Sequence, residues 1–215
     1  TKLFAAVFTG ELETARQYIP ILLDTLPMHA RQFYEPERLF LIAIALVDSA
    51  EEGDQKLVDK CYRELKEWTD ISYKNHSVKR LIVEAEILKR TNNNAKVMAA
   101  YDEAIEEAAE FLFTHLEGLA AERAGRYLFE QGKVRASARY LNQAYDLYDN
   151  WGAGRKLQQL VNDFPLFFEP KDMLAQKRPQ QRNYWDLYRQ TIEKEKVVSM
   201  PKNQRKSMPD LIAHF

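Results

Sequence analysis

The sequence predicts an all-α protein: antiparallel helix pairs that stack into an α-solenoid, followed by a basic helical extension. Three observations support this class. Glycine and proline are few, at 7 and 8 of 215 residues, which leaves long stretches without helix breakers. Small or turn-forming residues recur at a nearly constant interval. Apolar residues between them follow the i, i+3, i+4, i+7 spacing of amphipathic helices.

The interval is set by Gly10, Gly53, Asn92 and Gly132, which are 43, 39 and 40 residues apart. Two columns of mostly apolar residues keep the same register, nine and twelve positions after each turn residue. They consist of Ile19, Tyr62, Tyr101 and Leu141, and of Leu22, Leu65, Ala104 and Ala144. A plain helical bundle would use the same helices, but the recurring register favours a stack of repeats.

Each repeat reads as two amphipathic helices. In the first helix, Ile42, Ala45 and Leu46 begin one buried face, and in the second, Val58 and Leu65 carry the complementary stripe. A lone pair cannot bury its apolar face, so neighbouring pairs are expected to stack. At the helix starts, we expect Asp54 and Ser77 to act as N-caps and Pro36 to occupy a first turn.

In order along the chain, residues 1–9 are expected to end a truncated first helix, and 11–26 to form its partner, kinked or ended early by Pro20. Three pairs then follow, and a closing helix precedes Pro165. The pairs span 36–70, 78–115 and 118–150, and the closing helix spans Arg155–Asp163. The repeat domain is therefore predicted to cover 1–165. Because the chain starts without methionine inside an apolar helical pattern, we expect a fragment of a longer protein.

Residues 166–215 are predicted to form the basic C-terminal extension or linker, with one amphipathic helix near 183–198. From Lys171 onward there are ten Lys/Arg and five Asp/Glu residues, which leaves 21 basic and 27 acidic residues before it. Formal charges are thus about −6 for the body and about +5 for this segment. Such a split is typical of a solvated tail or linker, and it also occurs in basic arms that contact nucleic acid or anionic membrane.

Composition also bounds the compartment. The single cysteine, Cys61, cannot form an internal disulfide, which favours a reducing, cytoplasmic location. No run of 18 apolar residues and no signal-peptide pattern is present, so neither a membrane span nor secretion is expected.

The segment from Ala120 to Leu160 carries a family resemblance. Its Ala124-Gly125, Gly132 and Leu141 pattern resembles a tetratricopeptide unit lengthened from 34 to about 40 residues. Its end, with Tyr148, Trp151-Gly152-Ala153, Lys156 and Leu160, resembles the helical repeats that follow the regulatory ATPase-like region of large signalling kinases. The resemblance implies a region that relays or gates signals by binding proteins. It carries over no kinase or ATPase activity, because the modules that perform those reactions lie outside this segment.

Catalytic and metal-binding signatures are incomplete in this sequence. A di-iron bundle needs a Glu three residues before a His, but the four histidines are preceded at that distance by Leu26, Tyr73, Leu112 and Leu211. Gly132-Lys133 lacks the rest of a phosphate-binding loop, and the Gly152 to Gly154 segment reads as a helix stop. Cys61 reads as a packed helix residue. We therefore expect no catalytic site, metal or cofactor in this segment.

A concave surface lined by the first helices is the predicted partner-binding site. If the tetratricopeptide alignment holds, it comprises Phe40, Ala43, Val47, Lys79, Ile82, Glu86, Lys89, Glu122, Arg126 and Phe129. An apolar patch on such a groove would take a partner helix or peptide. In the alternative interpretation, Phe40 and Val47 pack against the preceding helix pair.

The function predicted from these observations is a protein–protein interaction or regulatory scaffold module of a larger signalling protein, with a protein, a peptide or a neighbouring domain as partner. One alternative is a non-catalytic regulatory segment of a multidomain ATPase or kinase. Another is an RNA-binding helical repeat, which the acidic body disfavours.

Overall fold

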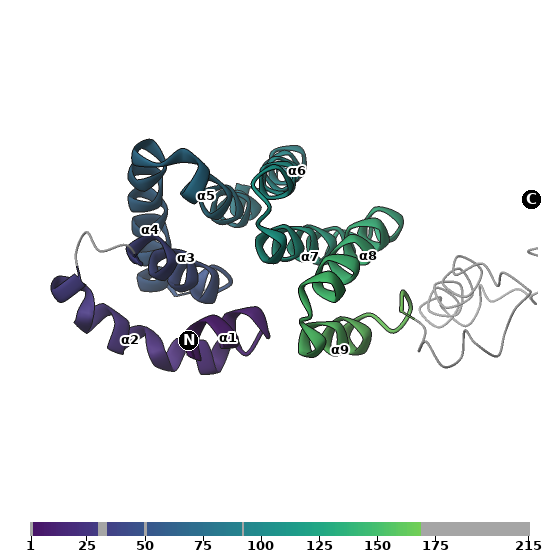
Figure 1. The fold of residues 1–215 in the computed structure, drawn as a ribbon, viewed down its shortest axis with the longest axis horizontal. Coiled ribbons are helices and arrows are strands. Elements are labelled where there is room, and N and C mark those ends of the chain that lie inside the picture. Colours follow the sequence, from purple (N-terminus) through teal and green to yellow (C-terminus); the bar gives the residue numbers. More distant parts are fainter. Residues whose placement is uncertain (1, 30–33, 50, 92, 169–215) are drawn as a thin grey trace, which may run out of the picture. The chain divides into compact units, whose positions relative to one another are not determined.

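The computed structural model describes residues 2–29, 34–49, 51–91 and 93–168, and these residues contain α-helices and no strand (Figure 1). The all-α class is therefore confirmed. By chain contacts the protein divides into two units, 1–160 and 161–215, and the second of these is described only as far as Phe168. The predicted helix near 183–198 and the rest of the basic extension lie outside the described residues.

The elements follow each other with short connections. They are α1 (Lys2–Phe8), α2 (Leu12–His29), α3 (Glu35–Leu46), α4 (Glu52–Ile71), α5 (Tyr73–Leu88), a 3-10 turn (Lys89–Thr91), α6 (Asn94–Glu110), α7 (Thr114–Glu130), α8 (Val134–Trp151) and α9 (Gly154–Asp163). Consecutive helices from α3 to α8 pack against each other, and α3 also contacts α5, as α5 contacts α7. The first helices of successive pairs are therefore neighbours.

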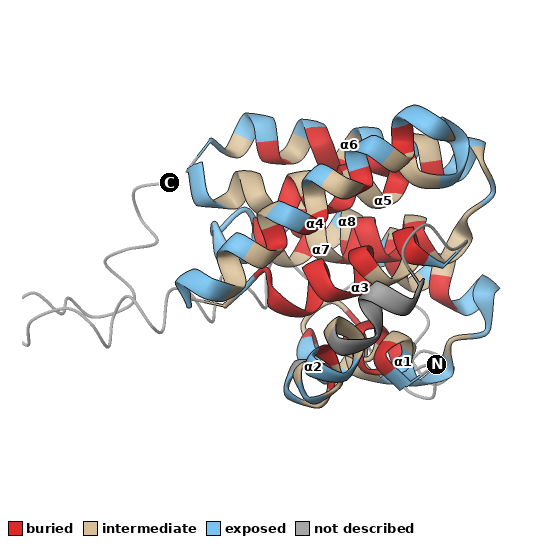
Figure 2. Cartoon of the chain, turned by 90° about the vertical axis from the view of Figure 1, so that its left-hand side faces the viewer, coloured by how far each residue is buried: buried red, intermediate tan, exposed pale blue. Residues whose placement is uncertain are grey.

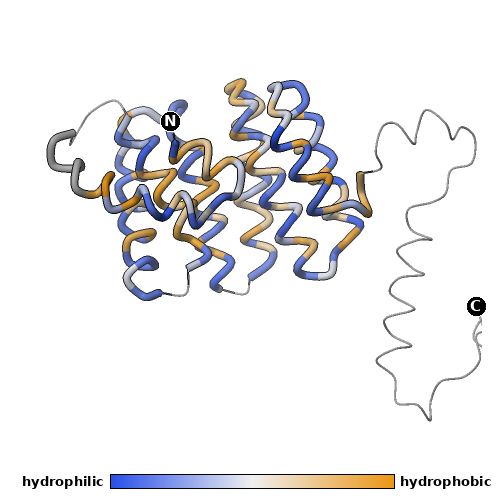
Figure 3. The backbone as a smooth tube through the Cα atoms, turned by 90° about the horizontal axis from the view of Figure 1, so that it is seen from below, coloured by the Kyte–Doolittle hydropathy of each residue, from blue (hydrophilic) through white to orange (hydrophobic). Residues whose placement is uncertain are grey.

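The first helices of the pairs are more extensively buried than the second helices. Ten of the twelve residues of α3 are buried, and α7 is buried along most of its length (Figure 2). In the second helices, α4, α6 and α8, buried residues alternate with exposed ones, and Figure 3 shows apolar and polar segments alternating along each helix. The amphipathic period that the sequence displays is thus the period of one buried face.

Three of the described helices end at a glycine in the left-handed conformation. At Gly10, Gly132 and Gly152 the chain turns with φ of 71°, 71° and 78°, values that glycine adopts without steric cost. At Gly132, its N–H bonds to the Phe129 carbonyl and the next N–H bonds to the Leu128 carbonyl, at 2.9 and 2.8 Å. The predicted stop at Gly152 is confirmed.

Several local predictions were wrong. Helix α2 does not end early at Pro20 but continues to His29, while the alternative of a kink at Pro20 stays a prediction. Gly53 lies inside the first turn of α4 rather than in a connection, and Asp54 follows it in the helix, because α4 already starts at Glu52. Ser77 is buried within α5, whose N-cap is Ser72. By contrast, Pro36 occupies the first turn of α3, as predicted. Asn92 lies outside the described residues.

Candidate interaction surface

Most of the predicted concave-surface residues lie inside the protein. Six of the ten are buried, namely Phe40, Ala43, Val47, Ile82, Glu86 and Glu122. The side chains of Lys79, Lys89 and Arg126 are partly buried in ion pairs, and Phe129 is 37% exposed. The set therefore does not form one open surface in this conformation, and partner binding by it stays a prediction.

The packing of α3 explains why the predicted surface residues on this helix are buried. Helices α1, α2, α4 and α5 all contact α3, so the side of α3 that would face a groove is covered by the chain's own N-terminal helices. Phe40 is fully buried as a result. Periodicity within one helix could not reveal this, because it identifies a buried face and not the number of helices that cover it.

A buried carboxylate on α5 joins two neighbouring pairs. Glu86 Oε1 accepts from Arg123 Nε of α7 at 2.5 Å and from the Tyr101 hydroxyl of α6, and Glu86 Oε2 lies 2.7 Å from Lys89 Nζ. Burial alone would raise the Glu86 pKa, but Arg123 and Lys89 lower it to about 2. Glu86 is therefore ionised at neutral pH. Burial beside this carboxylate raises the Tyr101 pKa, so the hydroxyl stays protonated and donates a hydrogen bond to Glu86.

The next pair contains a second buried carboxylate with the same set of partners. Glu122 of α7 lies 2.7 Å from Lys156 Nζ of α9, accepts from the Tyr148 hydroxyl of α8 at 2.8 Å, and pairs with Arg126 one turn away at 2.9 Å. Burial opposes ionisation of Glu122, but Lys156 and Arg126 outweigh it, and the pKa is lowered. Ammonium and ring also meet here, with Lys156 Nζ 5.4 Å from the Tyr148 ring centroid.

Both clusters follow one plan. A glutamate of a first helix binds a tyrosine of the second helix in the same pair and a cation from the next first helix or from the closing helix. Because each buried charge is satisfied only when three helices are in register, these clusters favour one arrangement of the pairs. Sequence reasoning had placed Glu86 and Glu122 on an open surface and missed this role.

Ring contacts run along the side of the protein where second helices finish and first helices begin. Phe111 and Phe113 are 6.3 Å apart, Phe113 and His115 6.5 Å, and His115 and Trp151 5.5 Å between ring centroids. Phe8 of α1 continues the series at 5.7 Å from Trp151. These contacts connect the starts and ends of helices from three different pairs.

Apolar side chains at this end reach solvent. The exposed fractions are 84% for Leu112, 74% for Ile71, 52% for Tyr73 and 40% for Trp151. Together with Phe111, which lies 5.3 Å from Lys74 Nζ, we call these residues the apolar edge. A signal for it exists in the sequence, since Ile71, Phe111 and Trp151 are spaced 40 residues apart and each stands at the C-terminal end of a second helix.

Other chemistry in the described part of the chain is limited. No group of three or more His, Cys, Asp or Glu side chains among the described residues is arranged to hold a metal ion. Cys61 is buried, and burial raises the pKa of its thiol to about 12. Among the described helices, none combines the length and apolar character that crossing a bilayer requires.

Comparison with known proteins gives no relative. No protein-family model, no curated protein and no solved structure matches this chain.

Proposed function

We propose that residues 1–160 form a protein-binding module: a tetratricopeptide-like solenoid that acts as an interaction scaffold within a signalling or regulatory protein. The apolar edge carries this proposal. Large apolar side chains exposed together on a surface are typical of sites that bind other proteins.

The buried clusters add a second line of support. Glu86 links α5, α6 and α7, and Glu122 links α7, α8 and α9, so the helices that end beside Leu112 and at Trp151 are tied to their neighbours by these buried, ion-paired carboxylates. A surface that is ordered before binding loses less conformational freedom when a partner docks. The apolar edge therefore has the preorganisation that a scaffold needs.

Affinity capture from a cell extract tests the proposal. The bait is the full chain, compared with an edge variant that carries Ile71→Ser and Leu112→Gly, and with the matched control Ile21→Ser, which replaces a 61%-exposed apolar side chain on α2. We expect a set of proteins that the wild type and the control recover and the edge variant loses, each then confirmed by direct binding of purified components. Equal recovery by all three baits would count against the proposal.

A further inference from the structure

Leu112 occupies a backbone position that elsewhere in this chain belongs to glycine. Its φ is 62°, and its N–H bonds to the Ala109 carbonyl while the Phe113 N–H bonds to the Ala108 carbonyl, at 3.2 and 2.8 Å. This is the same helix ending that Gly132 makes. A left-handed conformation costs a residue with a side chain about 1–2 kcal/mol. Since the Leu112 side chain is 84% exposed, packing within the chain does not offset that cost.

Carboxylates surround the apolar edge. They are exposed on the C-terminal halves of the second helices, at Glu67 and Asp70 of α4, Glu103, Glu106 and Glu110 of α6, and Asp146 and Asp149 of α8. The last turns of these three helices contain no basic residue. Negative charge near a helix C-terminus is unfavourable, because the carbonyl dipoles already point there. The C-terminal halves of α6 and α8 contain no basic residue, whereas that of α4 also contains Arg63 and Lys66, and Lys74 is placed over the Phe111 ring.

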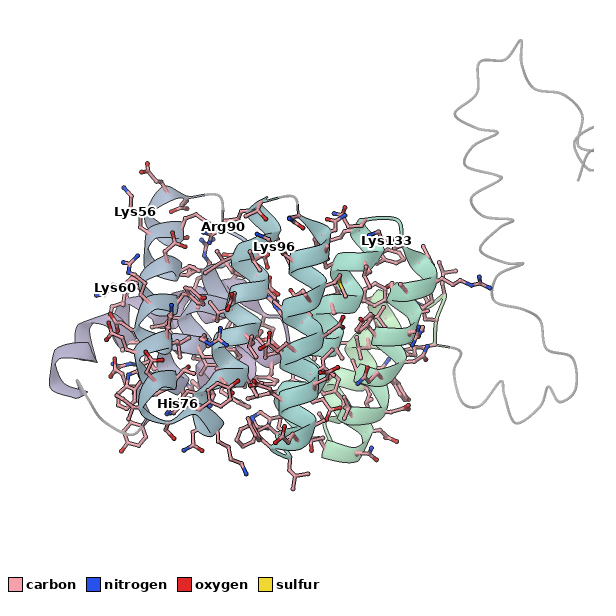
Figure 4. The ribbon with its side chains drawn as sticks, turned by 90° about the horizontal axis from the view of Figure 1, so that it is seen from above. Lys56, Lys60, His76, Arg90, Lys96 and Lys133 are labelled. Carbon is pink, nitrogen blue, oxygen red and sulfur yellow. The ribbon has the colours of Figure 1, made fainter. Side chains whose placement is uncertain are left out.

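The opposite end of the helices is mixed in charge, because its basic side chains stand beside carboxylates, as Lys56 does with Glu52 and Arg90 with Asp59. Lys56, Arg90, Lys96 and Lys133 gather where first helices end and second helices begin, whereas His76 marks the end that carries the apolar edge (Figure 4). The end that carries the apolar edge is thus the more acidic of the two. An approaching cationic segment would be drawn to the apolar edge, and an anionic one would be drawn away from it.

We propose that the apolar edge is a docking site for a basic amphipathic segment of a partner protein. Apolar side chains of that segment would cover Ile71, Leu112 and Trp151, and its lysines or arginines would pair with carboxylates such as Glu106 and Glu110. Two features that lower the stability of the free chain, the left-handed Leu112 and the acidic helix ends, are both accounted for by this one partner. The same carboxylates repel nucleic acid and anionic lipid.

This inference rests on the proposed function and specifies the chemistry of the partner. The test measures fluorescence anisotropy of a labelled designed helical peptide with leucines on one face and lysines on the other, titrated with the full chain. The comparison peptide has glutamate in place of every lysine. We expect the wild type to bind the lysine peptide with an affinity that falls as salt is raised, and to bind the glutamate peptide at least about tenfold more weakly.

Three variants localise the binding. The edge variant Ile71→Ser with Leu112→Gly should weaken binding about tenfold or more, although the glycine relieves backbone strain, so loss of binding is separated from loss of stability. A charge variant, Glu106→Lys with Glu110→Lys, should weaken it by a similar factor. The control Glu52→Lys, an exposed position at the opposite end, should stay within about twofold.

Equal affinity for both peptides, or binding that no edge substitution weakens, would overturn the inference. Self-association of the wild type that the edge variant abolishes, measured by sedimentation without peptide, would also overturn it, because a second copy would then cover the edge. If affinity capture shows edge-dependent partners while the lysine peptide does not bind, the partner chemistry is wrong and the proposed function stands. If capture shows no dependence on the edge, the proposed function itself fails.

Discussion

Arg123 of α7 donates to Glu86 of α5 across 2.5 Å inside the protein, and this pair links the first helices of two successive helix pairs. Water can replace little of this contact, since the Glu86 side chain is fully buried and that of Arg123 is 14% exposed. Burial lowers the Arg123 pKa, but Glu86 more than offsets this and the pKa is raised. Both groups are charged at neutral pH, and each depends on the other.

Glu86→Gln should destabilise the protein by about 3–5 kcal/mol, because it removes the buried counter-charge of Arg123 and Lys89 and leaves Arg123 with the more distant, exposed Asp48 at 3.7 Å. Urea unfolding followed by circular dichroism measures the change. Glu52→Gln is the matched control: Glu52 is exposed and pairs with Lys56 on the surface, so its loss should cost no more than about 0.5 kcal/mol. Replacing Glu86 and Arg123 together by leucine should recover part of the loss. A cost below 1 kcal/mol for Glu86→Gln would show that the pair does not hold the repeats together.

Acid should weaken the protein through the same carboxylate. The Glu86 pKa is about 2 in the folded chain, against 4.5 for the free group, so the unfolded state binds more protons between these values. Stability from Glu86 is therefore complete above about pH 5 and is lost as pH falls towards about 2. The difference in unfolding free energy between wild type and Glu86→Gln should shrink by on the order of 3 kcal/mol over that window. A difference independent of pH would contradict the lowered pKa.

Leu112→Gly should stabilise the chain by about 1 kcal/mol, because glycine adopts φ of 62° without a steric penalty and the leucine side chain is mostly exposed. Gly132→Leu makes the reverse exchange at the equivalent helix end, where φ is 71° and the space around the α-carbon is open. It should destabilise by a similar amount. Thermal unfolding should show a higher melting temperature than wild type for Leu112→Gly and a lower one for Gly132→Leu. Destabilisation by Leu112→Gly would mean that the leucine contributes packing after all.

Gly125→Ala should destabilise by about 1–3 kcal/mol, since a Cβ there would lie 2.7 Å from Leu141 Cγ and 3.2 Å from the Leu141 backbone nitrogen. Helices α7 and α8 would have to separate. Gly53→Ala is the control, because nothing lies within 4 Å of its Cβ position in the first turn of α4, and it should be neutral or stabilising by up to about 1 kcal/mol. Urea midpoints compare the two. Equal effects would show that the close approach at Gly125 is not required.

Sequence reasoning reached the elements of this fold and missed most of their contacts. The positions of the helices follow from apolar spacing, and the stop at Gly152 from glycine's freedom at positive φ, both of which are properties of a few neighbouring residues. The N-cap predicted at Ser77 was wrong, because α5 begins one turn earlier and burial of the serine depends on the helices around it. The apolar edge left a signal in the 40-residue spacing of Ile71, Phe111 and Trp151, but exposure could not be read from spacing.

By itself, the sequence determined that the described part of this chain is helical, roughly where its helices lie, and which face of each second helix is buried. Only the tertiary structure decided whether the remaining faces of the first helices are exposed or buried. Phe40 is enclosed because α1 and α2 pack on α3, and Glu86 is an internal ion-pair partner because Arg123 approaches it from 37 residues further along the chain. The physical reason is range: helix formation depends on residues three or four apart, whereas burial and pairing of charge depend on which distant helices meet.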